Sequence, residues 1–514
     1  MTNTTVAAAR SRLTCFQTWI TISAVLLVAA SSFETAAAAQ LMAGAAKVDI
    51  TNPNAAVDGP LHARALVIKS GDTTAVLVTL DVVSLGEIGY VSNEYLGDVR
   101  SRLEKELNIK PTNVIINTSH CHGIPCDDID DRTVQAVKAA AAKLVPVKVG
   151  VGAGSEDRVQ QNRRLKLKSG KVLDERHAYS LPANDEVAEV GPIDPQIGVL
   201  RLDAEDGRTV AVVYNFACHP IMGVPTDVNT ADMTGFSSQV IENNLSAGTI
   251  ALFVQGCAGD IDPIDYKRVD RPRNAEALGN ILGLSTLKAV RNIKTKSDDR
   301  MIVVNEKMEL PRADLAQRMV AMEEERQRLL DSLNGTFLNL ETFVRLAVKY
   351  NLSNDFPSNY AYRYLQEDAR NREGLRKLDA TNRARLKSYI RNVRTMEQLT
   401  RINTNLRLLR KHQQQLVDAG KRTIEVELVG LRVGDFVLTT FPGELTVPIG
   451  LGIKKRSPHE WTFVAGYTNG YIYYCPTAEQ LKNVGGAQED SDCLLAPEWQ
   501  KLYEDKAADI LRRL

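Results

Sequence analysis

Short runs rich in Val, Ile, Thr and aromatic residues recur along this chain, and several are apolar throughout rather than alternating. Unbroken apolar runs of this length are typical of strands covered on both faces. The runs are HARALVIK, TAVLVTLDV, TNVIINTS, VKVGVGA, IGVLRL, TVAVVYNF, TIALFVQG, VELVGLRVG, FVLTTF and TFVAGY. Helical patterns lie between them, at about 89–107, 132–144, 236–244 and 273–293. The sequence therefore predicts an α/β fold with a mixed β-sheet core and flanking helices.

Residues 311–421 follow a different pattern, in which apolar residues recur at helical spacing among Arg, Lys, Glu and Gln. Asn334-Gly335 and Pro357 interrupt it. We interpret this stretch as a helical hairpin or small bundle, inserted into a domain formed by 40–310 and 422–514. Strand-like runs flank it, so its two ends are expected to attach to neighbouring strands. Its charge is interpreted as a solvated face, with a partner-binding surface as the alternative.

The first 39 residues predict export. Arg10 and Arg12 precede the apolar run ITISAVLLVAA and a small-residue stretch that ends at Ala39. This order is typical of a secretory signal peptide. The run is shorter than the roughly 18 apolar residues that a membrane span needs, which makes an uncleaved anchor the weaker alternative. We expect residues 1–39 to be removed and the mature protein to be secreted or periplasmic.

Composition limits the partners and covalent links of the chain. Lys and Arg number 63, as do Asp and Glu, so the formal net charge is 0. Wrapping a nucleic-acid backbone requires a strong positive field, and we therefore expect no nucleic-acid partner. Six Cys follow residue 39, which permits up to three disulfides in an exported protein, although their spacing does not give the pairing. Metal ligation by Cys is the alternative, but no CxxC spacing favours it.

The sharpest motif is INTSHCHGIP, in which an apolar run ends in His120-Cys121-His122. Imidazoles two residues apart in an extended chain point the same way, so one can hold a metal while the other reaches a substrate. Two surface or packed histidines are the alternative. Only seven His occur in the chain, and two of them stand at this one strand exit before Gly and Pro, which favours a functional site.

Four further motifs follow apolar runs, and each is weak by itself. VYNFACHPIMG ends a run on His219, and LFVQGCAGDIDP places Gly256, Gly259 and Asp260 beyond another. FPGELTVPIG carries Glu444, and FVAGYTNGYIYYCP carries Tyr467, Tyr471, Tyr473 and Tyr474. In α/β sheets the carboxyl ends of strands are where chemistry is placed. The sequence has no GxxxxGK(S/T) phosphate loop, no GxSxG nucleophile elbow and no HExxH helix. Enzymes that depend on one of these three motifs are therefore excluded.

In their order along the chain, these motifs resemble the successive blocks of the neutral/alkaline non-lysosomal ceramidase family. The matching blocks are AGAAKVDIT, HARALVI, NTSHCHGIP, QNRRL, NFACHP, ADMTGF, FVQGCAGDIDP, FPGELT and NGYIYYCP. The resemblance spans about residue 44 to the C-terminus and is interrupted by 311–421. It implies the fold of a ceramidase catalytic domain and the activity of a mononuclear zinc amidase.

The resemblance also implies roles for individual residues. The zinc ligands would be His120, His219, Glu444 and Tyr474. The catalytic groups would be His122, Asp262 and Tyr471, and the substrate-binding residues would be Arg163 and Gly256. Two imidazoles and a carboxylate are an ordinary catalytic zinc shell, in which zinc lowers the pKa of a bound water towards neutrality.

Three departures from the family pattern bear on the substrate. Asp262 stands where ceramidases carry serine, and no counterpart of a further family tyrosine follows Tyr474. We also expect no C-terminal immunoglobulin-like domain. A carboxylate at position 262 favours a substrate with an amine or other polar group, or a second cation, over a long-chain ceramide.

We predict an exported zinc-dependent hydrolase that uses zinc-activated water to cleave an amide or ester bond of an N-acyl or lipid-like small molecule. The family connection would place it in sphingolipid metabolism. Peripheral contact with a membrane stays open, and the sequence does not give the oligomeric state. A non-catalytic zinc-containing binding protein is the alternative, and a different metal-assisted reaction is a third. Replacing Ala313–Gly420 by a short linker is expected to leave zinc binding intact.

Overall fold

The computed structural model describes residues 40–175, 181–223, 228–264, 266–268, 270, 272–357 and 361–514. The predicted signal peptide lies outside these residues, so its prediction stays untested. Within the described residues, no helix combines the length and the apolar character that crossing a membrane requires.

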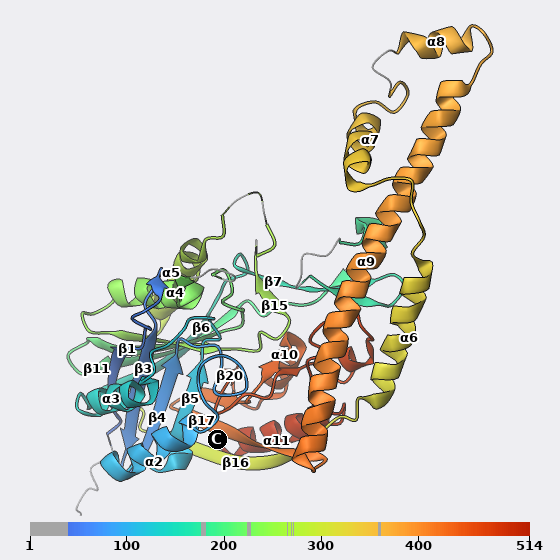
Figure 1. Cartoon of the computed structure of the whole chain (residues 1–514). Coiled ribbons are helices and arrows are strands. Elements are labelled where there is room, and N and C mark those ends of the chain that lie inside the picture. The colour runs from blue at the N-terminus through green and yellow to red at the C-terminus, as the bar shows by residue number, and fades with distance from the viewer. Residues whose placement is uncertain are drawn as a thin grey trace, which may run out of the picture. The chain divides into compact units, whose positions relative to one another are not determined.

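An eight-stranded mixed sheet is the centre of the fold, with strand order β14-β12-β11-β6-β1-β3-β4-β5 (Figure 1). β12 pairs parallel with β14 and β4 with β5, and the other neighbours pair antiparallel. Its strands are β1 (Met42–Asp49), β3 (His62–Ser70), β4 (Thr73–Leu80), β5 (Val114–Thr118), β6 (Val145–Ser155), β11 (Gln196–Ala204), β12 (Thr209–Phe216) and β14 (Ile250–Gln255). The predicted mixed α/β core is thus confirmed.

A second sheet packs on one face of the first. It has the order β16-β17-β18-β20 and consists of β16 (Met301–Pro311), β17 (Thr423–Val433), β18 (Phe436–Thr440) and β20 (Thr462–Ala465). Apolar side chains of both sheets form one buried cluster, to which Val213 and Leu431 belong. The sheets approach so closely that a Cβ atom at Gly198 would lie 2.1 Å from the Phe463 ring. Only glycine fits there.

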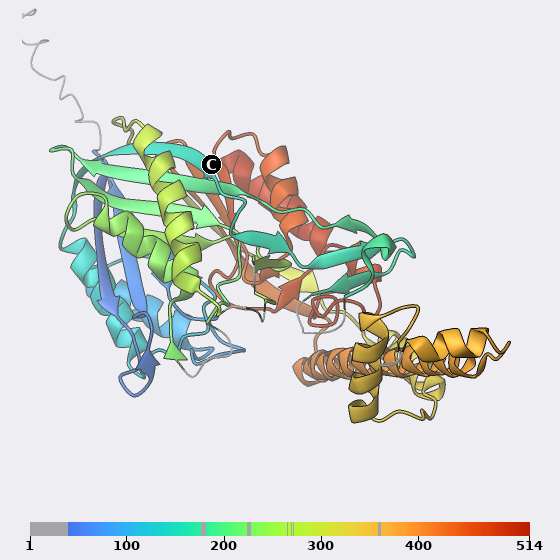
Figure 2. The ribbon, with the colours of Figure 1, turned by 90° about the horizontal axis from the view of Figure 1, so that it is seen from above.

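Helices complete four layers (Figure 2). The outer face of the eight-stranded sheet is covered by α2 (Tyr95–Leu107), α3 (Ile129–Ala141), α4 (Asp232–Asn243) and α5 (Ala275–Asn292). The outer face of the second sheet is covered by α10 (Val447–Arg456) and α11 (Trp499–Arg513). The first predicted helix starts later than expected, because Gly86 and Gly89 have φ of +83° and +80° and form a turn instead.

Four helices fill the predicted insertion: α6 (Ala316–Ser332), α7 (Leu340–Leu352), α8 (Tyr362–Asp368) and α9 (Gly374–Ala419). They lie between β16 and β17, which pair antiparallel with Pro311 opposite Thr423. The expectation that both ends attach to neighbouring strands is therefore confirmed. α6 packs on α9 through a small core that includes Met322 and Leu406.

Short strands and turns tie the loops together, and the sequence did not predict them. They are β2 (Ala56–Val57), β7 (Gln160–Asn162), β8 (Arg164–Leu167), β9 (Val172–Asp174), β10 (Val187–Val190), β13 (Val228–Asn229), β15 (Ile261–Pro263), β19 (Glu444–Leu445), β21 (Tyr474–Cys475), and the 3-10 turns Pro111–Asn113, Asn184–Glu186 and Gln480–Lys482. Two pairings bear on function, because β15 pairs with β7 and β19 pairs with β21. Segments of two to four residues carry too little periodicity to be recognised in a sequence.

His62 should make the stability of the fold depend on pH. Burial, followed by the nearby Arg64 charge, lowers the pKa of His62 from 6.5 to about 4. The unfolded chain therefore takes up a proton between these pH values that the folded chain does not. The free energy of unfolding is expected to fall as pH drops from about 6.5 to about 4, by up to about 3 kcal/mol. Urea unfolding across this range should show a shallower fall for His62→Gln, and an unchanged fall would contradict this assignment.

Candidate metal centre

Three predicted residues from three strand ends meet in the interior. His120 follows β5, His219 follows β12, and Glu444 begins β19 shortly after β18. All three are buried, and one ligand atom from each lies within 4.8 Å of the others. Glu444 Oε2 is 3.0 Å from His219 Nε2, and Glu444 Oε1 is 3.5 Å from His120 Nε2. In the part of the chain that the structure describes, this is the one group of His, Cys, Asp and Glu arranged to hold a metal ion.

Hydrogen bonds fix both histidine rings in the form that ligates a metal. The Nδ1 atom of His120 is 2.7 Å from the Val83 carbonyl oxygen, and that of His219 is 3.0 Å from the Ile261 carbonyl oxygen. Because a carbonyl oxygen only accepts, each Nδ1 donates, and the neutral form of either ring then carries its lone pair on Nε2. Ligating histidines usually make this outer bond. Two lone pairs and a carboxylate then face one another, which fits a metal cation between them.

Burial and neighbouring groups also set the charge states. Burial lowers the pKa of His120 to about 3, although the Glu444 carboxylate acts in the opposite direction. Burial alone would raise the pKa of Glu444, but the two histidines and the Tyr471 hydroxyl outweigh it and hold that pKa below its usual range. At neutral pH the His120 imidazole is therefore neutral and Glu444 is ionised. These are the states that bind a divalent cation.

Tyrosines from the loop after β20 surround the three residues. The Tyr467 hydroxyl donates to Glu444 Oε2 at 3.1 Å, and the Tyr471 hydroxyl donates to Glu444 Oε1. β21 pairs with β19, which brings the Tyr474 hydroxyl to 3.5 Å from His219 Nε2. Ligation by Tyr474 and catalysis by Tyr471 stay predictions. Sequence reasoning gave Tyr467 no role, although it stands just beyond a strand, as the other site residues do.

The backbone around the centre is strained and closely packed. φ is +68° at His120, +52° at Tyr467 and +64° at Tyr473. In non-glycine residues such angles cost about 1–3 kcal/mol each, and residues with strained backbone angles cluster at functional sites. A Cβ atom at Gly256 would lie 3.1 Å from the Phe216 carbonyl oxygen, so this glycine allows a close contact between two strand ends. Substrate binding by Gly256 stays a prediction.

His122 lies beside the buried group and faces solvent. Its side chain is exposed, and its ring centroid is 5.7 Å from that of His120. The two histidines of the motif therefore occupy different environments, one buried with the metal donors and one accessible. An accessible imidazole at this distance is placed to exchange a proton with a substrate. Its catalytic role stays a prediction.

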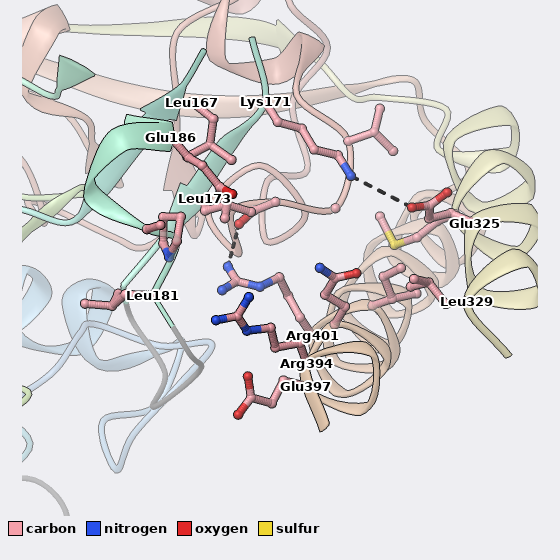
Figure 3. Close-up of a pocket in the computed structure, with 18 residues that line it drawn as sticks. Leu167, Lys171, Leu173, Leu181, Glu186, Glu325, Leu329, Arg394, Glu397 and Arg401 are labelled. Atoms are coloured by element: carbon pink, nitrogen blue, oxygen red, sulfur yellow. Dashed lines mark hydrogen bonds and ion pairs between the residues drawn. The ribbon is translucent and has the colours of Figure 1, made fainter. Parts of the chain in front are cut away.

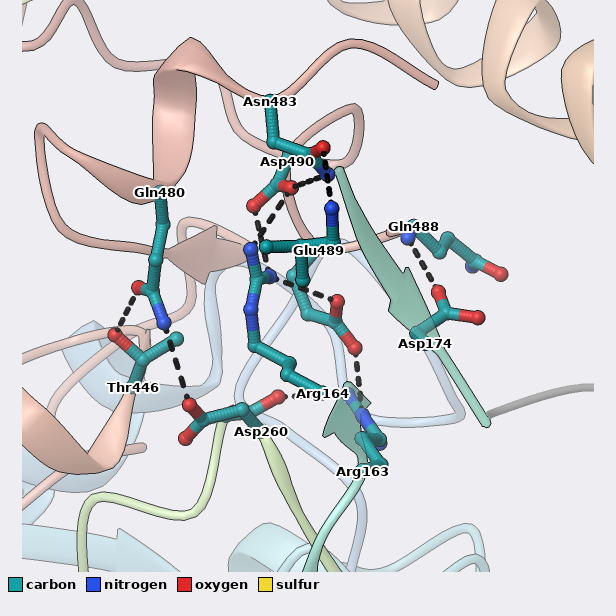
Figure 4. Close-up of polar contacts among 12 residues, drawn as sticks. Arg163, Arg164, Asp174, Asp260, Thr446, Gln480, Asn483, Gln488, Glu489 and Asp490 are labelled. Atoms are coloured by element: carbon teal, nitrogen blue, oxygen red, sulfur yellow. Dashed lines mark hydrogen bonds and ion pairs between the residues drawn. The ribbon is translucent and has the colours of Figure 1, made fainter. Parts of the chain in front are cut away.

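Arg163 is held by two carboxylates in the interior. Its Nη1 donates to Asp262 Oδ1 at 2.7 Å, its Nε donates to Glu489 Oε1 at 2.5 Å, and its Nη2 donates to the Gly259 carbonyl oxygen at 2.6 Å. Figure 4 shows the pairing with Glu489. The guanidinium lies 5.6 Å from the centre of the Tyr474 ring. The structure thus places Arg163 behind a site tyrosine, and its contact with substrate stays a prediction.

The pairing changes the interpretation of Asp262. The sequence suggested that this carboxylate attracts an amine or a second cation, but Arg163 already opposes its charge. Asp262 is fully buried, and its Oδ2 atom has no hydrogen-bond partner among the described residues. Asp262 therefore belongs to a buried ion-pair network, in which Arg163 also contacts Glu489 and Glu489 also contacts Arg164, and it is not a lone negative charge. A direct catalytic role for Asp262 stays a prediction.

Helix α9 reaches the loops that carry the centre, which the sequence did not predict. Gln415 donates to the Tyr473 hydroxyl at 3.2 Å and to Glu87 Oε2 at 3.4 Å. The Tyr473 hydroxyl donates to the same Glu87 oxygen at 2.7 Å, and His412 Nε2 lies 2.8 Å from Asp492 Oδ1. The loop with Glu87 also supplies the carbonyl partner of the first histidine. Metal binding without the insertion stays a prediction, and these contacts weigh against it.

A separate cavity of about 240 Å³ lies between α6, α9 and the β8–β9 hairpin (Figure 3). Its apolar lining includes Leu167, Leu173, Leu329 and Ile402. Across it, Lys171 Nζ lies 3.8 Å from Glu325 Oε1, and Arg401 Nη1 donates to Asp174 Oδ1 at 2.8 Å. None of the predicted site residues lines it. The cavity is therefore distinct from the candidate metal centre.

In the described part of the chain, the cysteines are six buried free thiols: Cys121, Cys126, Cys218, Cys257, Cys475 and Cys493. None of the three disulfides that the sequence permitted is formed among them. None belongs to the metal-binding group either. Burial raises the pKa of Cys121 to about 12, which keeps it protonated and unreactive at neutral pH. These residues act as small apolar side chains of the core.

Comparison with known proteins agrees with the fold. No protein-family model matches the sequence, and no curated protein matches it. The solved structure of neutral ceramidase from Pseudomonas aeruginosa matches with a TM-score of 0.58 and 16% identity, over 93% of this chain and 75% of that one. A ceramidase complexed with C2 matches with the same TM-score and 17% identity, over 93% and 76% of the two chains. The chain has the fold of the neutral ceramidases, with a buried His-His-Glu group that can bind a metal ion.

Proposed function

We propose that this protein is a zinc-dependent hydrolase that cleaves an amide or ester bond of an N-acyl substrate. The observation that carries the proposal is the convergence of two Nδ1-anchored histidines and one ionised carboxylate on a single point. Two nitrogens and one oxygen are donors that zinc takes in catalytic sites, where a further position stays open for water. Calcium and magnesium prefer all-oxygen sites, so the donor set favours zinc over them.

In this mechanism His120, His219 and Glu444 would hold the ion. Bound zinc would supply a water of lowered pKa and would polarise the substrate carbonyl. Tyr467 and Tyr471 hold the Glu444 carboxylate by hydrogen bonds, which fixes its direction. The Tyr474 hydroxyl would donate to the carbonyl oxygen as negative charge develops there. His122 would protonate the leaving nitrogen or oxygen.

The substrate is proposed to be a neutral N-acyl compound of lipid-like character. The Asp262 carboxylate is already paired with Arg163, so it does not stand as a free charge for the amine that was expected to bind there. Recognition would then rest on the acyl group and on the carbonyl that meets the metal, rather than on a charged amine. A place in sphingolipid metabolism follows only if the substrate is a sphingolipid.

The protein is proposed to act outside the cytoplasm, as a secreted or periplasmic enzyme. The support is the signal-peptide pattern of residues 1–39. N-terminal sequencing of the exported protein should find a start near Gln40. A mature protein that retains Met1 in the cytoplasmic fraction would contradict this part of the proposal.

Metal analysis followed by a substrate panel tests the function. We expect the purified protein to hold about one zinc per chain and to hydrolyse at least one member of a panel of N-acyl and O-acyl lipids. Glu444→Gln is the test variant, because it keeps the shape of the side chain and removes its charge. It should lose both zinc and activity. A protein with zinc that hydrolyses no member of the panel would favour the non-catalytic binding protein.

A further inference from the structure

Helix α7 (Leu340–Leu352) exposes an apolar stripe. Leu340, Val344, Val348 and Leu352 recur every four residues, which places them along one side of the helix. Their exposed fractions are 67%, 49%, 54% and 82%. Phe337, just before the helix, is 84% exposed. We call these five residues the α7 stripe.

The opposite side of α7 is also apolar, and it is already in use. Phe343, Leu346 and Tyr350 pack in a small core with Leu386 and Tyr389 of α9. The α7 stripe is therefore not needed to attach α7 to the insertion. Apolar residues on both sides of a helix are typical of helices that are buried on both sides. A contiguous exposed apolar surface of this kind marks an interaction site in soluble proteins.

Charge around the stripe identifies the kind of partner. Residues 337–390 carry ten Lys and Arg against six Asp and Glu, a net charge of +4, whereas the whole chain has a net charge of 0. The Arg385 guanidinium lies 4.8 Å from the centre of the Phe337 ring, so a cation stands directly at the apolar surface. Apolar residues flanked by Lys and Arg are typical of helices that lie in the headgroup region of anionic membranes.

We propose that the α7 stripe binds the surface of a membrane that contains anionic lipids. The four leucine and valine side chains would enter the boundary between headgroups and acyl chains, and the surrounding cations would meet the lipid phosphates and carboxylates. A second copy of this chain fits the stripe less well. A two-fold contact through the same surface would bring two regions of net charge +4 together, which is unfavourable.

The position of the stripe along α9 suits this role. α9 contacts the loops of the catalytic fold at Arg401, His412 and Gln415, whereas α7 packs at Leu386 and Tyr389. At about 1.5 Å per residue, Leu386 and His412 are about 40 Å apart along the helix. In Figure 1, α7 lies beside the part of α9 that is farther from the sheets. Lipid contact at the stripe would thus leave the candidate metal centre uncovered. The inference does not depend on the proposed hydrolysis.

Vesicle sedimentation tests the proposal with the full chain and with a form that starts at Gln40. The probes are vesicles of phosphatidylcholine alone and vesicles of phosphatidylcholine mixed with phosphatidylserine. Both forms should bind the mixed vesicles at least about tenfold more tightly than the vesicles of phosphatidylcholine alone. High salt should weaken the binding to the mixed vesicles. The test variant is Val344→Gln/Val348→Gln/Leu352→Gln, because glutamine keeps the helix propensity and removes apolar surface. This triple variant should bind the mixed vesicles at least about tenfold more weakly than the unaltered protein does.

The matched control is Leu284→Gln/Leu502→Gln, which changes two exposed leucines on α5 and α11. It should bind as the unaltered protein does. Circular dichroism and sedimentation velocity on every form establish that each is folded and report its oligomeric state. The proposal is overturned if neither form binds mixed vesicles, if only the full chain binds, or if the triple variant binds normally. It is also overturned if the unaltered protein is a dimer that the triple variant dissociates, because a second copy then covers the stripe.

Discussion

Replacing His219 by alanine should weaken metal binding by more than about 100-fold and abolish the proposed hydrolysis, while the protein stays folded. The loss of an outer hydrogen-bond partner alone costs about 10–100-fold in metal affinity, and His219 supplies one of the three donors itself. The side chain lies at a strand end rather than between the two sheets, so the core should remain intact. Zinc content after dialysis against buffered zinc, together with hydrolysis of the panel lipids, measures both effects.

His459→Ala is the control for the removal of a histidine. Its Nε2 atom lies 2.7 Å from the Leu511 carbonyl oxygen, and it does not belong to the metal-binding group. This variant should keep its zinc. Full zinc occupancy in both His120→Ala and His219→Ala would show that the ion, if present, is bound elsewhere. Loss of zinc in His459→Ala would show that the assay reports unfolding and not ligation.

Sequence reasoning succeeded where the relevant information is local. Strands such as β12 and β14 are mostly apolar because helices cover one face and a second sheet covers the other. Polar residues that directly follow such strands stand out against them. His120 and His219 were identified in this way, and Glu444 through its place in a family block after β18. Chains of this class bring strand ends to one edge, so the three residues could be expected to meet.

The sequence could not reveal contacts between residues far apart in the chain. Arg163 and Glu489 are separated by 326 positions, and no local pattern links them. Asp262 was therefore interpreted as a lone charge, when its meaning depends on the arginine beside it. The same holds for Gln415, which meets Tyr473 and Glu87 through the fold of the insertion. Charge compensation and the support of a loop by a distant helix depend on two residues that meet in the fold, so neither is visible in the identity of one residue.

The Arg163 network provides the second large effect, which is on stability. Arg163→Met should lower the free energy of unfolding by about 3–5 kcal/mol, because it leaves the Asp262 carboxylate buried without a counter-charge and leaves Glu489 with only its longer contact to Arg164, at 3.3 Å. Urea unfolding followed by circular dichroism measures this loss. Arg208→Met is the matched control, since Arg208 pairs with Asp206 at the surface and both side chains are more than half exposed. It should change stability by less than about 1 kcal/mol.

A double variant separates charge compensation from packing. Arg163→Met/Asp262→Ser removes the carboxylate that Arg163→Met strands, so it should be more stable than Arg163→Met alone, with a coupling free energy between the two positions above about 1 kcal/mol. Asp262→Ser by itself leaves Arg163 paired with Glu489, and it introduces the serine that the resemblance to ceramidases would place at this position. If Asp262 acts within the buried ion-pair network and not on a ligand, this single variant should change stability more than substrate choice. A gain of ceramide hydrolysis by Asp262→Ser with unchanged stability would show that the Asp262 charge acts on the substrate. If the losses in the free energy of unfolding of the two single variants add up strictly in the double variant, Arg163 contributes by packing alone.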